Sequence, residues 1–556
     1  MRAQPRCASP AGRSRFRVLP LLAVAGALSV SIAGTAIGEP EAAPAPTPQL
    51  LQRGAALYTQ HCAACHGETG RGDGKAAYLV YPKPRDFTLT RFRLVSADNK
   101  VASVSDLFAT ITRGMPGSAM PGWGHFSEAD RWALAYQVRA LTRDGKAARL
   151  VAEDGVDPAV AAKVAERLTT PGAPVAVPPE PPVTPEALER GKRIYTESCV
   201  SCHDVDGRGL KKRDLKDDNE FPIFARDFTR GVFKGGTTGA DLAHRLLAGM
   251  PGTPMPSYRE NIPKGDDLWA LIHYVQSMIV PGAQERVLQR QISLRAVRVS
   301  EEQVLFDPTS PVWQKMPATF VPLMPLWWRD DRVEGVEVRA ARNALQVAFQ
   351  LTWTDTTRNE LTIAQDAFSD GAALQFSPSA DPPFFGMGAR SEPVNIWSWK
   401  AAWENDLASF RDVQEGHPDM VVDRYQSLQD PPLGRHSPVG EFPTGMHDPT
   451  WLTGWGAGNV VSHPKRVSSV EDLNAQGFST LTNQGKGAQS VFGRARWDSG
   501  TWRVVFVREL AASEAPDVIF RPGGSMNIGF AVWNGAASDR NGQKSVTIWH
   551  RLAIDE

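Results

Sequence analysis

One five-residue pattern occurs twice in this chain of 556 residues: Cys-x-x-Cys-His, at 62–66 and at 199–203. In each copy two thiols lie about one helical turn apart and a histidine follows at once. This is the pattern at which a haem is attached through two thioether bonds, with the histidine placed to bind the iron. The residues concerned are Cys62, Cys65, His66, Cys199, Cys202 and His203. Two copies predict two covalent c haems and a protein that moves electrons.

The cysteine count supports this interpretation. Four of the five cysteines stand in the two motifs, and the fifth, Cys7, lies near the amino terminus, so no cysteine is left for a disulfide. The alternative is a tetrahedral zinc site built from the four motif cysteines. Zinc would leave both motif histidines and the methionines described below without a role, so the pattern favours haem.

The first 38 residues have the composition of an export signal. Five arginines and no acid precede an apolar run at 18–37, and small residues stand before Glu39. We expect a Sec-type signal peptide at 1–38, cleaved near Gly38, and hence a periplasmic protein. The apolar run is nearly long enough to cross a bilayer, so an uncleaved membrane anchor is the alternative.

Composition divides the rest of the chain into domains. Proline- and alanine-rich stretches at 39–48 and 169–185 are typical of extended spacers. Thirteen of the 16 tryptophans follow residue 290, and the 61 basic and 61 acidic residues balance, which gives no indication of a nucleic-acid partner. The predicted parts are a linker at 39–47, a haem domain at 48–146, a linker at 147–185, a second haem domain at 186–282, and a third domain at 290–556.

The two haem domains repeat one design. Arg-Asp-Phe-Thr follows each motif, at 85–88 and 226–229, and Gly-Met-Pro-Gly-x-x-Met-Pro comes next, at 114–121 and 249–256. Each copy closes with a predicted amphipathic helix, at 127–141 and 264–278. The spacing is nearly constant, as packing around a fixed cofactor requires.

A methionine in each repeat is the candidate second ligand of the iron. Met120 and Met255 each precede a proline on a loop that cannot continue a helix. A thioether opposite histidine stabilises Fe(II) and raises the potential. Met115 and Met250 compete for the role. Both segments resemble monohaem class I cytochrome c domains, whose ligand is usually the methionine before Pro-x-aromatic, and this resemblance implies Met120 and Met255.

From residue 290 onward the periodicity changes from helical to alternating. Residues 344–353 place apolar side chains from Leu345 to Trp353 on one face, and similar runs stand at 501–508, 528–533 and 545–549. Asn541-Gly542 is a strong hairpin signal. This pattern predicts an antiparallel β-sandwich. The alternative is that this sandwich binds carbohydrate or has a structural role only.

Several short sequence segments of this third domain are similar to segments of a known protein family. They are Phe-Phe-Gly-Met-Gly at 384–388, Asn-Ile-Trp-Ser-Trp-Lys at 395–400, Glu-Asp-Leu-Asn-Ala-Gln-Gly-Phe at 471–478 and Phe-Ala-Val-Trp-Asn-Gly at 530–535. Together they resemble the haem-b-binding domain of the ethylbenzene dehydrogenase gamma-subunit family, which serves molybdoenzymes of the dimethyl sulfoxide reductase family. The resemblance implies a b haem held by a methionine and a lysine. It assigns Met387 and Lys544 to the b-haem iron, with Lys465 and Lys486 as alternatives for the lysine.

The predicted architecture is two all-α cytochrome c domains followed by an all-β antiparallel sandwich, with two covalent c haems and one non-covalent b haem. No catalytic residue is assigned. The resemblance implies a relay between a molybdenum and iron–sulfur oxidoreductase and a soluble c-type cytochrome or terminal oxidase, with the direction reversed if the partner is a reductase. The alternatives are a dihaem enzyme of the peroxidase type and a ligand-binding sensor with attached cytochrome domains. The peroxidase type needs an open iron site, whereas both c haems here have methionine candidates.

Overall fold

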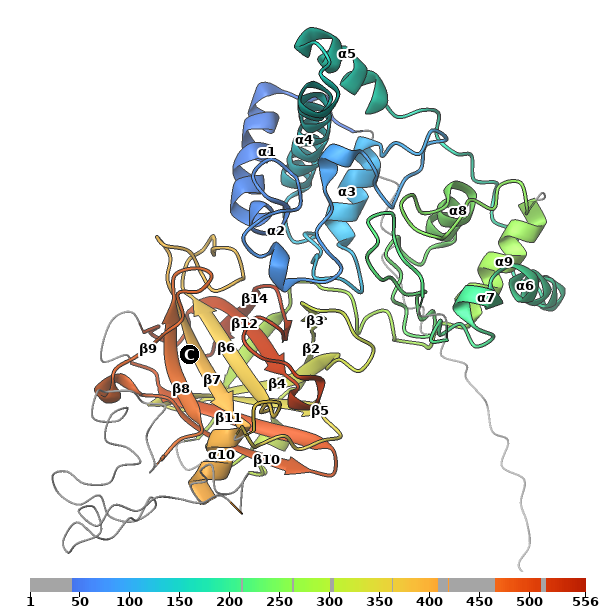
Figure 1. Cartoon of the computed structure of the whole chain (residues 1–556). Coiled ribbons are helices and arrows are strands. Elements are labelled where there is room, and N and C mark those ends of the chain that lie inside the picture. Colours follow the sequence, from blue (N-terminus) through green and yellow to red (C-terminus); the bar gives the residue numbers. More distant parts are fainter. Residues whose placement is uncertain are drawn as a thin grey trace, which may run out of the picture. The chain divides into compact units, whose positions relative to one another are not determined.

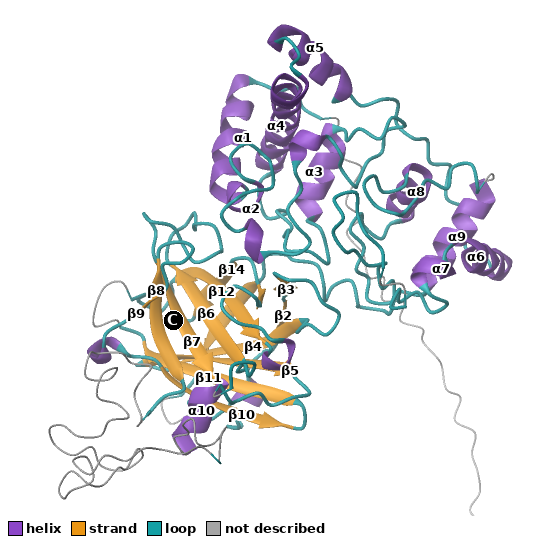
Figure 2. Ribbon diagram, in the orientation of Figure 1, coloured by secondary structure: helices purple, strands orange, loops and turns teal. Residues whose placement is uncertain are grey.

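The computed structural model describes most of the chain after residue 42 (Figures 1 and 2). The described residues are 43–211, 214–262, 265–300, 305–362, 364–408, 419, 466–511 and 517–556. The predicted signal peptide at 1–38 and Lys465 therefore lie outside them. Among the described helices, none combines the length and the apolar character that a bilayer crossing needs.

Helices build the first haem domain. They are α1 (Pro48–His61), α2 (Ala63–His66), α3 (Val104–Arg113) and α4 (Glu128–Asp154), with 3-10 turns η1 (Ala77–Leu79) and η2 (Phe87–Leu89). The hydroxyls of Thr47, Ser103 and Ser127 cap α1, α3 and α4 by accepting amide hydrogen bonds from the first turn. Helices α1 and α4 run side by side and so close that a β-carbon at Gly54 would overlap the carbonyl oxygen of Ala133 (Figure 1). The glycine before the motif is therefore needed for helix packing.

The second haem domain repeats this arrangement. It consists of α6 (Pro185–Ser198), α7 (Val200–His203), α8 (Gly239–Ala248) and α9 (Gly265–Ser277). A β-carbon at Gly191 would overlap the carbonyl oxygen of Ala270, as at the matching position of the first domain. The hydroxyls of Tyr58 and Tyr195 each donate to a backbone carbonyl nine residues further on, at 2.8 and 2.7 Å. The two copies therefore share their packing as well as their motifs.

The helix that closes the first copy is longer than predicted. We expected a helix at 127–141 and a proline-rich linker at 147–185, but α4 continues to Asp154 and α5 (Pro158–Leu168) follows. Residues 146–154 contain no glycine or proline, and α4 ends at Gly155, which adopts φ 64°. Leu150 of α4 packs on Ala161 and Ala165 of α5, so this part of the predicted linker forms a small apolar core.

One sheet builds the third domain, with helix α10 (Ala401–Ala408) beside it. Its strands are β1 (Ser293–Arg298), β2 (Thr319–Pro322), β3 (Met324–Pro325), β4 (Gly335–Arg342), β5 (Gln346–Thr354), β6 (Gly371–Ser377), β7 (Val394–Lys400), β8 (Val470–Ala475), β9 (Thr482–Asn483), β10 (Phe492–Asp498), β11 (Thr501–Glu509), β12 (Ser525–Trp533), β13 (Ser545–Val546) and β14 (His550–Ile554). The main strand order is β10-β11-β5-β4-β1-β14-β12-β6-β7-β8-β9. The mostly antiparallel pairing confirms the predicted class.

The sheet departs from the prediction in three details. Strand β1 pairs in parallel with both β4 and β14, because it lies between strands that are far from it along the chain and can be reached by long crossovers. Leu345 is 72% exposed, since it precedes β5 in a turn held by the side chain of Asn343. The predicted strand 545–549 breaks after Val546, where the hydroxyl of Thr547 accepts the amide of Phe530 in place of a backbone carbonyl.

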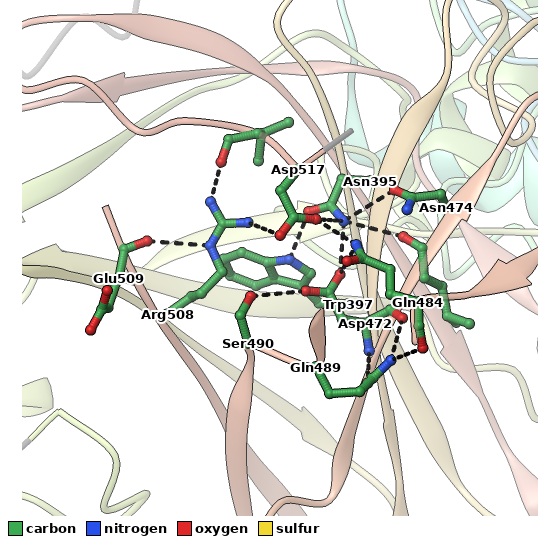
Figure 3. A network of polar contacts seen from close by, with 12 residues as sticks. Asn395, Trp397, Asp472, Asn474, Gln484, Gln489, Ser490, Arg508, Glu509 and Asp517 are labelled. Carbon is green, nitrogen blue, oxygen red and sulfur yellow. Dashed lines mark hydrogen bonds and ion pairs between the residues drawn. The ribbon is translucent and has the colours of Figure 1, made fainter. Parts of the chain in front are cut away.

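A buried polar network crosses the edge of this sheet (Figure 3). The carboxylate of Asp472, on β8, accepts hydrogen bonds from Asn395 at 2.8 Å, Gln484 at 3.1 Å and Ser490 at 3.2 Å. Burial and the neighbouring Asp517 carboxylate raise the pKa of Asp472 to about 7. The network links β7 and β8 to the segment that follows β8.

Candidate haem sites

The first attachment motif holds its histidine in one orientation. His66, on α2, contacts the carbonyl oxygen of Arg85 through Nδ1 at 3.1 Å, and its ring stacks on Phe87 at 4.6 Å between centroids. Because the carbonyl can only accept, Nδ1 carries the proton and Nε2 is left for an iron. Burial lowers the pKa of His66 to about 4, which keeps the imidazole neutral as ligation requires.

The second motif opens onto a cavity lined mostly by apolar side chains. His203, on α7, stacks on Phe228 at 4.4 Å between centroids, and burial lowers its pKa. The cavity wall includes both motif cysteines, His203, Met250 and Met255. Thioether-forming thiols, an imidazole and a thioether around an apolar space fit a c haem.

The methionine loops of the two copies fold alike. The amide of Met115 donates to the carbonyl of Met120 at 3.0 Å, and the amide of Met250 donates to that of Met255 at 3.1 Å. The loop brings both methionines of the second copy to the cavity wall. The choice of Met120 and Met255 as ligands therefore stays a prediction from the sequence pattern.

The third domain contains a cavity of about 1230 Å³ that includes Met387 and Lys544 in its lining. Met387 adopts φ 72°, the left-handed region that non-glycine residues seldom occupy, and its carbonyl accepts the amide of Gly477 at 2.7 Å. Backbone strain of this kind persists where the surroundings impose it, and it concentrates at binding sites. The aromatic residues Phe384 and Phe385 stand beside Met387 in the same wall.

Lys544 lies in this cavity without a carboxylate partner. Within the described part of the chain it forms no ion pair, and its Nζ lies 4.7 Å from the ring centroid of Trp533. Burial lowers the pKa of Lys544 to about 8, so this amine loses its proton at a lower pH than an exposed lysine does. Of the alternatives, Lys486 lies in a 3-10 turn at Lys486–Ala488, and Lys465 is outside the described residues.

The first haem domain also lines this cavity, which the sequence did not predict. Cys65, Ala76, Leu79 and Val80 are part of the wall that includes Met387 and Lys544. The one sequence signal was the apolar run at 76–81, which has no counterpart between motif and Arg-Asp-Phe-Thr in the second copy.

Tyr81 lies where all three domains meet. Its amide donates to the carbonyl of Leu326 at 2.8 Å, its ring stacks on Trp327 at 5.1 Å between centroids, and its hydroxyl donates to the carbonyl of Pro222. Trp327 lines the cavity of the third domain, whereas Tyr81 and Trp328 line the cavity of the second motif. The walls of the candidate sites are thus connected through one cluster of aromatic side chains.

Comparison with known families assigns all three domains. Residues 310–545 match the family described as ethylbenzene dehydrogenase. Residues 49–136 match cytochrome c oxidase, cbb3-type, subunit III, and residues 188–278 match cytochrome c. Two cytochrome c domains imply two covalent c haems.

Three relatives are similar to about half of the chain. The gamma subunit of dimethylsulfide dehydrogenase from Rhodovulum sulfidophilum is 28% identical over 44% of this chain and 72% of its own length. The gamma subunit of chlorate reductase from Ideonella dechloratans is 27% identical over 49% of this chain and 88% of its own length. A Haloferax mediterranei protein, provisionally named a respiratory nitrate reductase haem subunit, is 25% identical over 44% of this chain and 67% of its own length. These matches confirm the resemblance found in the sequence: the chain is a haem-containing electron-transport protein that joins two cytochrome c domains to a gamma-subunit-like domain of the ethylbenzene dehydrogenase family.

Proposed function

We propose that this chain is a periplasmic relay with two c haems and one b haem. It passes electrons between a molybdenum and iron–sulfur oxidoreductase and a soluble c-type cytochrome or a terminal oxidase. The observation that carries the proposal is the shared cavity, in which Met387 and Lys544 of the third domain and Cys65 of the first attachment motif line one wall.

The residues of this cavity fit a b haem. Its volume of about 1230 Å³ exceeds that of an ordinary small-molecule site, and Phe384, Phe385 and Trp533 are among its lining. Met387 offers a thioether and Lys544 an amine that burial shifts towards its neutral form. When bound, the haem would supply a one-electron redox centre. The side chains of Met387 and Lys544 would hold the iron, and the aromatic lining would exclude water.

The cavity walls support an order for the relay. Cys65 belongs both to the first attachment motif and to the wall of the third domain's cavity. Tyr81 and Pro82 of the first haem domain line the cavity of the second motif. We therefore place the first c haem between the b haem and the second c haem. Electrons would enter at one end of this series and leave at the other.

The partner is inferred from the relatives. Two of them are named as gamma subunits, one of a dehydrogenase and one of a reductase, so they belong to multisubunit oxidoreductases. By analogy the third domain would receive electrons from, or give them to, a catalytic subunit. The second haem domain would then exchange them with a soluble carrier.

Haem stoichiometry tests the proposal. Acid–acetone extraction of the full-length protein should remove one haem per chain and leave two attached, as measured by pyridine haemochrome spectra of both fractions. Cys62→Ala and Cys199→Ala should each reduce the retained haem by one. Met387→Ala should reduce only the extractable haem. Met324→Ala, which changes a buried methionine of the same domain that does not line the cavity, is the matched control. A protein that yields no extractable haem would refute the b site.

A further inference from the structure

Buried and half-buried cations gather where the two haem domains meet. Arg85 and Arg93 come from the first domain, and Arg226 and Lys234 come from the second. Lys234 is 9% exposed and Arg93 is 7% exposed. The positive charges of Arg226, Arg93 and Arg85 add to burial in lowering the pKa of Lys234, which places all four groups within electrostatic reach of one another.

Acidic residues do not balance this cluster. Asp217 pairs with Arg93 at 2.7 Å between carboxylate oxygen and guanidinium nitrogen, and both side chains are buried. Arg85, Arg226 and Lys234 form no ion pair with any residue that the structure describes. An uncompensated buried charge is costly, so the cluster is expected to hold an anion that belongs to the folded protein.

The cluster lies beside both attachment motifs. The carbonyl oxygen of Arg85 is the partner of the His66 ring nitrogen, and Arg226 occupies the same position in the second repeat. Arg93, Arg226 and Lys234 line the cavity that contains His203. Cations of both domains therefore face the space of the second c haem.

The first domain is held to this cavity by further contacts. Arg113 of α3 donates to the carbonyl of Lys234 at 3.1 Å, and Arg245 of α8 donates to the carbonyl of Val95 at 2.7 Å. These bonds fix the backbone around Lys234 and next to Arg93. The cationic side chains are thus positioned from both sides of the domain boundary.

We propose that Arg85, Arg93, Arg226 and Lys234 form a carboxylate-binding site for the propionates of the c haems, and that the first haem domain supplies Arg93 to the second haem. Each haem c keeps two propionate groups, which carry the negative charge that the cluster lacks. Planar guanidinium groups bind carboxylates bidentately, which suits them to this ligand. The inference rests on the two c haems of the proposed function and is independent of the b haem.

This arrangement makes the potential of the second haem depend on the first domain. A cation close to a haem disfavours the ferric state, and a propionate left without its cation favours it. Loss of Arg93 or of Lys234 should therefore lower the reduction potential of the second haem. The potential should also depend more steeply on pH, because the unpaired propionate would take up a proton within the measured range.

The test compares Arg93→Met and Lys234→Met with Arg91→Met in the full-length protein. Arg91 lies at the same domain boundary and pairs with Asp218 at 2.7 Å, but its side chain is 62% exposed and it does not line the cavity. Spectroelectrochemical titration should show a lower potential for the second haem in the first two variants and an unchanged one in Arg91→Met. The second haem's signals are assigned by electron paramagnetic resonance of the Met255→Ala protein. Arg93→Lys keeps the charge and should restore most of the potential, which separates an electrostatic effect from misfolding.

Three outcomes would overturn the proposal. The first is that Arg93→Met and Lys234→Met leave both potentials equal to those of Arg91→Met. The second is that only the first haem's potential changes. The third is that the wild-type potential follows the phosphate concentration at constant ionic strength, which would show that the cluster holds an anion from solution. A protein with fewer than two covalent haems would instead refute the proposed function, so the two failures are distinguishable.

Discussion

Leu79 of the first haem domain packs against Gly542 of the third, so closely that a β-carbon at position 542 would overlap the leucine methyl group. Gly542 belongs to the turn predicted from Asn541-Gly542, and the amide of Gln543 closes this turn on the carbonyl of Arg540 at 2.8 Å. Lys544 follows two residues later. A residue of the first haem domain therefore fixes the turn that positions the proposed b-haem ligand.

This contact predicts that Gly542→Ala weakens retention of the b haem. The added methyl group must displace either Leu79 or the turn, at a cost of about 1–3 kcal/mol. Transfer of haem to apomyoglobin should be faster than in the wild type. Leu79→Ala combined with Gly542→Ala relieves the overlap and should bring the transfer rate back towards the wild-type value. If the double variant loses haem as fast as Gly542→Ala, the contact does not control the turn.

Acid should release the lysine of the b haem before it affects the c haems. Lysine ligates iron only as the neutral amine, and burial alone already brings the pKa of Lys544 down to about 8. As the pH falls, protonation competes with iron, so the b haem should become high-spin while both c haems stay low-spin. Lys544→Ala should show the high-spin absorption bands at neutral pH. Lys486→Ala is the control, and a high-spin b haem in that variant alone would transfer the ligand role to Lys486.

Sequence reasoning succeeded where the chemistry is local. The two cytochrome c domains and the strands at 501–508 and 528–533 were predicted correctly, and their signals depend on residues close together in the chain. The extension of α4 beyond 141 was not predicted, although residues 146–154 contain no glycine or proline and Gly155 provides the C-cap.

The contacts between domains could not be derived in this way. Leu79 and Gly542 are separated by most of the chain, and Arg93 and Asp217 lie 124 residues apart in different haem domains. No spacing rule relates such positions, because their proximity follows from how finished domains pack. The apolar run at 76–81 indicated only that this segment needed a partner.

The methionine assignments predict separate effects in the two c haems. Met120→Ala and Met255→Ala should each convert one low-spin haem to a high-spin or water-bound form and lower its potential, because the thioether that stabilises Fe(II) is gone. Met115→Ala and Met250→Ala are the matched controls from the same loops and should keep low-spin spectra. An unchanged spectrum in Met120→Ala, together with a high-spin haem in Met115→Ala, would assign the first iron to Met115.

The buried carboxyl of Asp472 predicts that the third domain loses stability as the pH rises. Its pKa is raised from 3.8 to about 7, chiefly by burial, so the folded protein binds this proton more tightly than the unfolded chain does. The resulting stabilisation is complete below about pH 4 and is lost as the pH rises through 7. Asp472→Asn cannot ionise and keeps an oxygen for the hydrogen bond from Asn395. Guanidinium unfolding should therefore show a smaller fall in the free energy of unfolding between pH 5 and pH 8 for Asp472→Asn than for the wild type. The difference should be on the order of a few kcal/mol. Asp498→Asn, at the exposed end of β10, is the control, and equal pH slopes in Asp472→Asn and the wild type would mean that Asp472 is ionised in the folded protein.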